Sequence, residues 1–176
     1  MKTRLSRFLF TALLAALLCS CTNVPENVVP VKNFNVDRYL GKWYEIARLD
    51  HPFERGSEKI NAQYSLRDDG GINVTNRGFN VKDQEWDEAL GRAYFVKDTN
   101  IGFLKVSFFG PFYSSYIIAY LDDDYQTALI SGPKKNYFWI LSRTPNIDDA
   151  KLKSLISRGK ELGFKTDELI FVRHEL

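Results

Sequence analysis

The feature that most constrains the fold of this chain is a series of short alternating segments between Trp43 and Leu141. Each segment places apolar side chains at every second position and ends at a turn signal, as strands do. Such a repeat of short antiparallel strands favours a closed barrel or a sandwich. We expect eight strands, at residues 42–49, 59–66, 72–79, 87–96, 102–109, 113–121, 126–131 and 137–143.

A helix is expected after the eighth strand, over residues 147–162. Acidic residues in Asn146-Ile147-Asp148-Asp149 suit a helix start, and Gly163 suits its end. One side of this helix would be apolar, through Leu152, Leu155, Ile156 and Leu162. A last short strand is expected at residues 168–172. The sequence therefore predicts an all-β fold with one C-terminal α-helix.

The first twenty residues have the pattern of a secretory signal, which is removed from the mature protein. Three basic residues precede an apolar run over residues 8–18, which is shorter than the roughly 20 residues that a membrane-spanning helix needs. The run ends in Leu18-Cys19-Ser20-Cys21 and resembles a bacterial lipobox, with Cys21 as the lipid-attachment residue. The alternative is an ordinary cleaved signal that leaves Cys21 as a free thiol.

This interpretation divides the chain into a signal peptide (1–20), a lipid-anchored tether (21–37) and one barrel domain (38–176). Removing the three basic signal residues leaves 21 basic against 22 acidic residues, so the net charge falls from +2 to about −1. A nucleic-acid partner is therefore not indicated. Cys21 would be the one cysteine left, which excludes an intrachain disulfide.

Three motifs give the chain a resemblance to the lipocalins, and especially to the bacterial outer-membrane and apolipoprotein D types. Gly41-Lys42-Trp43-Tyr44 matches the G-x-W-Y opening of the family. Leu121-Asp122-Asp123-Asp124-Tyr125 is a loose version of its T-D-Y turn. Arg143 matches the arginine at the end of the eighth strand. The resemblance covers the whole mature domain and implies an eight-stranded up-and-down barrel with the helix packed outside.

The resemblance gives Trp43 and Arg143 structural roles. Trp43 would lie inside the closed end of the barrel, with the guanidinium of Arg143 over its indole face. Glu45 shares the inward period of Trp43 and Ala47. We expect it to pair with Arg143 or with a tyrosine hydroxyl near that closed end.

An eight-stranded barrel has room for its own side chains or for one small ligand. Several inward positions carry small residues, which favours a ligand cavity over a filled core. The expected ligand-binding residues are Ala62, Tyr64, Val74, Ala93, Phe95, Leu104, Val106, Phe108, Tyr116, Tyr137, Trp139 and Leu141. Either face of strand 113–121 is apolar enough to point inward. At the open mouth we expect Phe53, Arg55, Phe112, Lys134 and Lys135.

Apolar walls below a basic rim suit a fatty acid or a lysophospholipid. The resemblance implies a protein that stores or transports such lipids for maintenance of the outer membrane, including under stress. It would be anchored there through Cys21 and face the periplasm. An envelope protein with a filled barrel is the alternative. Exposed aromatics at residues 109–113 would suit a membrane or a second copy of the chain as a homodimer.

Catalysis is not indicated by the sequence. It has no G-x-S-x-G segment, no paired metal-ligand histidines and no phosphate-binding loop. We therefore expect neither a catalytic residue nor a metal site nor a cofactor.

The lipobox makes a testable prediction about processing. Globomycin blocks the peptidase that cleaves lipoprotein precursors, so treated cells should accumulate a larger form of this chain on a denaturing gel. A Cys21→Ser variant should lose this sensitivity. An unchanged mobility of the wild-type chain under treatment would refute the lipoprotein interpretation.

Overall fold

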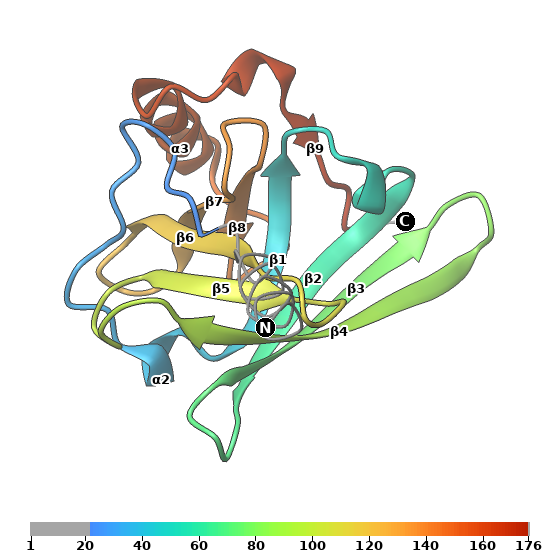
Figure 1. The fold of residues 1–176 in the computed structure, drawn as a ribbon. Helices are drawn as coiled ribbons and strands as arrows, with labels where there is room; N and C mark the ends of the chain where they lie inside the picture. The colour runs from blue at the N-terminus through green and yellow to red at the C-terminus, as the bar shows by residue number, and fades with distance from the viewer. Residues whose placement is uncertain (1–21, 176) are drawn as a thin grey trace, which may run out of the picture.

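Eight antiparallel strands wind into one closed barrel, as the resemblance implied, and not into the sandwich that the alternation alone left open (Figure 1). The computed structural model describes residues 22–175, so the expected signal peptide and Cys21 lie outside the described residues. The strands are β1 (Gly41–Arg48), β2 (Ser57–Leu66), β3 (Ile72–Asn80), β4 (Glu85–Phe95), β5 (Phe103–Ser107), β6 (Ser114–Leu121), β7 (Thr127–Ser131) and β8 (Phe138–Ser142).

β1 closes the barrel because it pairs with two neighbours. Trp43 lies opposite Ala62 of β2, and Glu45 lies opposite Leu141 of β8. Every other strand pairs with the strand next in sequence, so the topology is up-and-down. A ninth strand, β9 (Ile170–Phe171), also pairs with the end of β1.

The C-terminal helix α3 (Asp149–Glu161) packs on the outside of the barrel (Figure 1). The Asp148 carboxylate caps its start by accepting hydrogen bonds from the backbone N–H groups of Ala150 and Lys151. Gly163 follows the helix with a φ of +84°, which a glycine adopts without strain. Within residues 22–175, no helix is both long and apolar enough to cross a membrane.

The strands have two buried faces. The inward face contributes to one core cluster, inside the barrel. The outward face of β1, β7 and β8 contributes to a second cluster beneath α3, where Leu155 is 2% exposed. There the rings of Phe138 and Phe164 stack with centroids 4.3 Å apart. These two clusters explain why β7 is buried along its whole length.

Residues 28–34 of the expected tether pack against the barrel instead. Val28 and Phe34 are buried, each at 5% exposed. The backbone N–H of Val31 donates to Ile118 O at 2.9 Å, and its carbonyl accepts from Gly102 N. The tether prediction is therefore wrong for these residues, because buried apolar side chains and main-chain hydrogen bonds hold the segment along β5 and β6.

β3 and β4 extend beyond the rest of the barrel as a long hairpin (Figure 1). β4 pairs with β5 only from Arg92 to Phe95, so residues 85–91 have no strand partner on that edge within the described chain. Trp86 and Leu90 on this part are 47% and 68% exposed. The end that carries the β3–β4 turn is the open mouth.

The opposite end is sealed. A short helix, α2 (Val36–Tyr39), crosses it, and the Trp43 indole N–H donates to Tyr39 O at 2.8 Å. The guanidinium carbon of Arg143 lies 4.1 Å from the Trp43 ring centroid, the packing that the resemblance implied. Arg143 also donates to three carbonyl oxygens, those of Arg38, Lys42 and Tyr125.

This seal predicts a large loss of stability for Arg143→Ala. The variant loses the contact with Trp43 and leaves three carbonyls without their charged donor, so its free energy of unfolding should fall by about 2–4 kcal/mol in urea denaturation. Arg158 is the control, since it lies 4.3 Å from the Tyr120 ring on the outside of the barrel. Arg158→Ala should cost less than about 1 kcal/mol. Equal losses in both variants would contradict a sealing role for Arg143.

Candidate functional site

The inward face of the barrel brings the expected ligand-binding residues together. Tyr64, Val74, Ala93, Leu104 and Leu141 belong to the inner core cluster. Six more are partly buried and pack against it: Ala62, Phe95, Val106, Phe108, Tyr116 and Trp139. Tyr137 lies outside that cluster, next to Trp139, with ring centroids 6.2 Å apart. Strand β6 points Tyr116 and Ile118 inward, whereas Ile117 packs beneath α3.

Solvent accessibility differs along the interior. At the sealed end Trp43, Ile118 and Ala128 are completely buried at 0%. Ala62, Val106, Phe108 and Trp139 keep part of their surface accessible although their side chains face inward. A barrel filled by its own side chains would bury them completely. The inner wall is therefore fully buried around Trp43 and partly accessible to solvent at these other positions.

Three tyrosine hydroxyls meet inside the barrel. Tyr116 Oη lies 2.7 Å from Tyr39 Oη and 3.0 Å from Tyr64 Oη. Burial raises the pKa of Tyr64 to about 12 and raises the pKa of Tyr39 and Tyr116 as well. The three side chains are thus neutral hydroxyls at physiological pH, and they form a polar cluster within the apolar wall.

A β-bulge in β1 puts two charged side chains on the inner face. The pairing of β1 with β8 shifts by one residue between Glu45 and Ala47. Glu45 lies opposite Leu141 and Arg48 lies opposite Trp139, and both partners face inward. Cross-strand neighbours share a face, so Glu45 and Arg48 point into the barrel although they are three residues apart.

The bulge builds a buried ionic network near the mouth. Arg48 Nη1 donates to Glu45 Oε1 at 3.0 Å, and Arg48 Nη2 donates to the backbone oxygen of Glu54 at 2.8 Å. The Glu54 carboxylate accepts from Trp139 Nε1 at 3.2 Å and lies 3.0 Å from His51 Nε2. Glu45 and Arg48 are each 3% exposed.

This network corrects two expectations from the sequence. Glu45 pairs with Arg48, not with Arg143 or a tyrosine hydroxyl, and Ala47 belongs to the outer cluster. The wall is also less free of charge than expected, because Arg48 was not assigned to it. The inward–outward alternation of side chains along β1 is interrupted at the bulge. The residue types in Glu45-Ile46-Ala47-Arg48 do not predict this interruption.

Burial and the neighbouring carboxylate of Glu54 raise the pKa of Glu45 well above its ordinary value of 4.5, while Arg48 opposes this shift. Glu45 and Glu54 therefore compete for the Arg48 guanidinium in a region that is largely shielded from water. A protonated Glu45 removes the conflict.

Four side chains among the described residues have a buried nitrogen or oxygen without a hydrogen-bond partner: Arg48, His51, Asn76 and Ser107. Asn76 lies opposite Ala62, on the inward period of Val74, and its Oδ1 is buried without a hydrogen-bond partner. Neither ring nitrogen of His51 makes a hydrogen bond of good geometry. Asn76 was not predicted as a site residue, because a polar side chain does not fit an apolar wall. Its position two residues after inward-facing Val74 could have indicated that it points into the barrel.

The expected mouth residues have different surroundings. Phe53 and Phe112 are 66% and 77% exposed, and the Phe53 ring stacks on His51 at 4.1 Å. Arg55 pairs with Asp50 at 2.6 Å. Lys134 is exposed and makes no ion pair with the described residues.

Lys135 corrects the expectation of a basic rim. Its ammonium donates to the carbonyl of Leu162, after the C-terminal end of α3, and lies 4.6 Å from the Phe164 ring centroid. It therefore stabilises the packing of the helix instead of facing the mouth. Across residues 22–175, histidine, cysteine and acidic side chains form no group of three or more that could hold a metal ion.

Comparisons with known proteins agree with this architecture. A family model described as a lipocalin-like domain matches residues 34–174. Outer membrane lipoprotein Blc of Vibrio cholerae is 50% identical over 96% of this chain and 99% of its own length. Bovine apolipoprotein D is 35% identical over 65% of this chain and 63% of its own length. The solved structure of insecticyanin from the tobacco hornworm superposes with a TM-score of 0.68 at 16% identity, covering 87% of each chain.

The raised pKa of Glu45 predicts a pH dependence of stability. The folded state binds the Glu45 proton more tightly than the unfolded state, so stability should fall as the pH rises above about 4.5. Glu45→Gln keeps a neutral side chain of the same shape and should lose less stability over that range. Urea denaturation from pH 4.5 to 7.5 measures the difference between the two proteins. Parallel curves would contradict the raised pKa.

Proposed function

The chain belongs to the lipocalin family, and from that membership we propose that it binds a fatty acid or a lysophospholipid with the acyl chain inside the barrel. It is a lipid-binding protein of the outer membrane, in keeping with relatives of that name that match nearly its full length. We propose lipidated Cys21 as its anchor, with the barrel on the periplasmic side. Its role would be to store or carry such lipids for membrane maintenance, including under stress.

The partly accessible inner wall carries this proposal. Side chains on the inner wall are apolar and remain partly accessible, notably Val106, Phe108 and Trp139. An acyl chain would cover that surface, and each buried methylene would contribute about 0.8 kcal/mol. The sealed end at Trp43 limits how deep the chain can enter. A structural envelope protein would have no reason to leave this wall uncovered.

The head group of the ligand would lie close to the mouth, beside the network of Glu45, Arg48 and Glu54. Arg48 already pairs with the carboxylates of Glu45 and Glu54, although its Nε atom makes no hydrogen bond with the described residues. Exposed Lys134 is the better partner for an anionic head. The Oδ1 atom of Asn76 would accept a hydrogen bond from a hydroxyl of the ligand. Such an arrangement favours a lipid with both an anionic group and a hydroxyl.

A first experiment identifies the ligand directly. The protein is purified from its membrane, its bound lipids are extracted, and they are measured by mass spectrometry. We expect fatty acids or lysophospholipids at close to one per chain. After delipidation, a fluorescence titration with oleate and with a lysophospholipid should saturate. Failure to bind either lipid would favour the alternative of a structural protein.

Filling the interior provides the matched mutational test. Val106→Trp adds a bulky side chain on the inner wall and should weaken oleate binding at least about tenfold, because it occupies the space of the acyl chain. Leu90→Trp places the same side chain on the exposed face of β4, where Leu90 is 68% exposed, and should leave binding unchanged. Thermal denaturation of both variants checks that each is folded. Equal affinities would place the ligand outside the barrel.

A further inference from the structure

The loop between β5 and β6 presents the most exposed large apolar side chains of the described chain. Phe109 is 83% exposed and Phe112 is 77% exposed. A backbone hydrogen bond from Phe112 N to Phe109 O, at 3.2 Å, holds the two residues in one turn. Their neighbour Phe108 faces the barrel interior instead. This loop, residues 108–113, therefore joins the inner wall to an apolar outer surface.

The N-terminal segment begins beside this loop. Ser115 Oγ donates to Asn23 O at 2.7 Å, which fixes Asn23 at the start of β6. Cys21 precedes Asn23 by two residues, a separation of at most about 7 Å. Phe112 precedes Ser115 by three residues, which span at most about 11 Å. A lipid on Cys21 would therefore hold the loop within a short distance of the bilayer surface.

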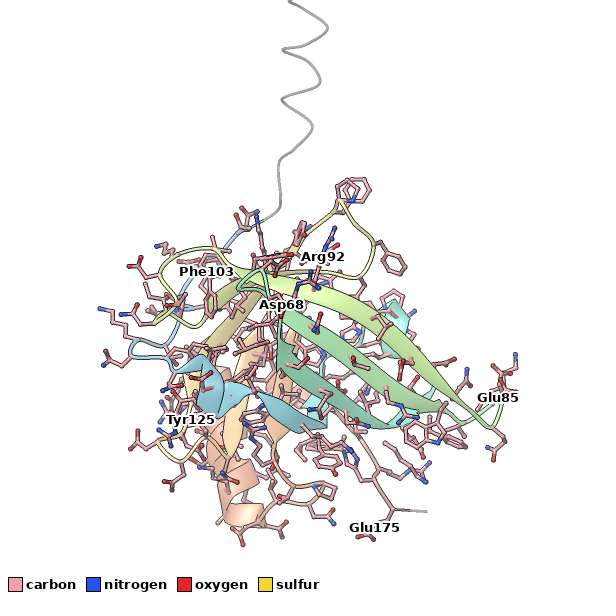
Figure 2. All side chains as sticks on the ribbon, turned by 90° about the horizontal axis from the view of Figure 1, so that it is seen from below. Asp68, Glu85, Arg92, Phe103, Tyr125 and Glu175 are labelled. Carbon is pink, nitrogen blue, oxygen red and sulfur yellow. The ribbon has the colours of Figure 1, made fainter. Side chains whose placement is uncertain are left out.

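Cationic side chains flank the exposed phenylalanines. Arg92 Nη2 lies against Gly110, 2.9 Å from where a Cβ atom would stand. Lys105 Nζ lies 5.1 Å from the Tyr113 ring centroid. Neither cation forms a salt bridge with an acidic side chain of residues 22–175. Figure 2 shows Arg92 on the side where the described chain begins, away from the hairpin tip at Glu85.

We propose that residues 108–113 form a membrane-docking loop, whose partner is the phospholipid bilayer that also holds the lipid on Cys21. Phe109 and Phe112 insert among the head groups and upper acyl chains, where aromatic side chains are stable. Arg92 and Lys105 lie at the level of the anionic phosphates. This inference rests on the proposed lipid attachment at Cys21 and adds to it a fixed orientation of the barrel.

The orientation has a consequence for ligand entry. The docking loop belongs to the mouth, since β5 ends and β6 begins there. With the loop inserted, the partly accessible inner wall at Phe108 lies next to the bilayer. A lipid can then pass between membrane and barrel without its acyl chain crossing water.

A depth measurement tests the proposal on the complete lipidated chain. After signal removal, Cys21 is the one native cysteine, and lipidation blocks its sulfur. Phe112→Cys therefore provides a single free thiol for a nitroxide spin label. The control is Asp124→Cys, in the exposed β6–β7 turn at the sealed end. Both labelled proteins are reconstituted into vesicles of phosphatidylethanolamine and phosphatidylglycerol, and accessibility to oxygen and to a water-soluble nickel complex gives the depth of each label.

We expect the label at residue 112 to be accessible to molecular oxygen and shielded from the nickel complex. The label at residue 124 should be as accessible to the nickel complex as a label in water. Equal nickel accessibility at both positions would overturn the docking loop. Strong spin–spin broadening at residue 112, in vesicles and detergent alike, would assign the loop to a second copy and overturn the proposal as well.

Vesicle flotation separates this inference from its premise. A chain that floats with the vesicles while its residue 112 label stays in water keeps the anchor and refutes docking. A chain that does not float refutes the lipid anchor at Cys21, and the docking-loop proposal is refuted as well. Oleate binding in solution is measured separately and does not depend on either result.

A double variant gives the functional readout. Phe109→Ser/Phe112→Ser should slow the transfer of a fluorescent fatty acid from vesicles to the lipidated protein by about tenfold. Leu90→Ser is the matched control, because it removes an exposed apolar side chain from β4. Its transfer rate should equal that of the wild type. A double variant as fast as this control would also overturn the proposal.

Discussion

The closure of the barrel depends on β1, which must pair with β2 on one edge and β8 on the other. A strand in that position has to bend to follow the curvature of the sheet, and a β-bulge is the ordinary way to do so. Here the bulge lies between Glu45 and Ala47. The same irregularity in β1 also turns Arg48 inward. The strand that joins the two edges of the barrel therefore also carries the buried ionic network.

The two ends of the barrel are built from opposite kinds of contact. At the sealed end, Trp43 and Arg143 are fixed by packing and by hydrogen bonds to main-chain carbonyls. At the mouth, the side chains of Phe53 and Phe112 are largely exposed. A ligand would therefore reach the inner wall from the mouth and not from the sealed end.

Most of the architecture could be predicted from the sequence, because alternation and turn residues are local signals. The strands lie within a few residues of their expected positions, and Gly163 follows the helix as expected. Pairing of Glu45 with Arg48 was not predictable, since a bulge leaves no mark in the residue types. The N-terminal segment was misjudged for another reason. Val28 and Phe34 have no period of their own, and only the surface of β5 and β6 makes them part of the core.

The open edge of β4 has a consequence for many copies crowded on one membrane. Residues 85–91 expose unpaired backbone groups, and such an edge can add a strand from another molecule and start aggregation. Glu85 and Asp87 place negative charges along this edge, whereas Glu88 is paired with Arg77 at 3.6 Å. Two copies that approached edge to edge would bring these charges together and repel each other. The acidic edge would therefore oppose edge-to-edge aggregation of copies that lie close together on a membrane.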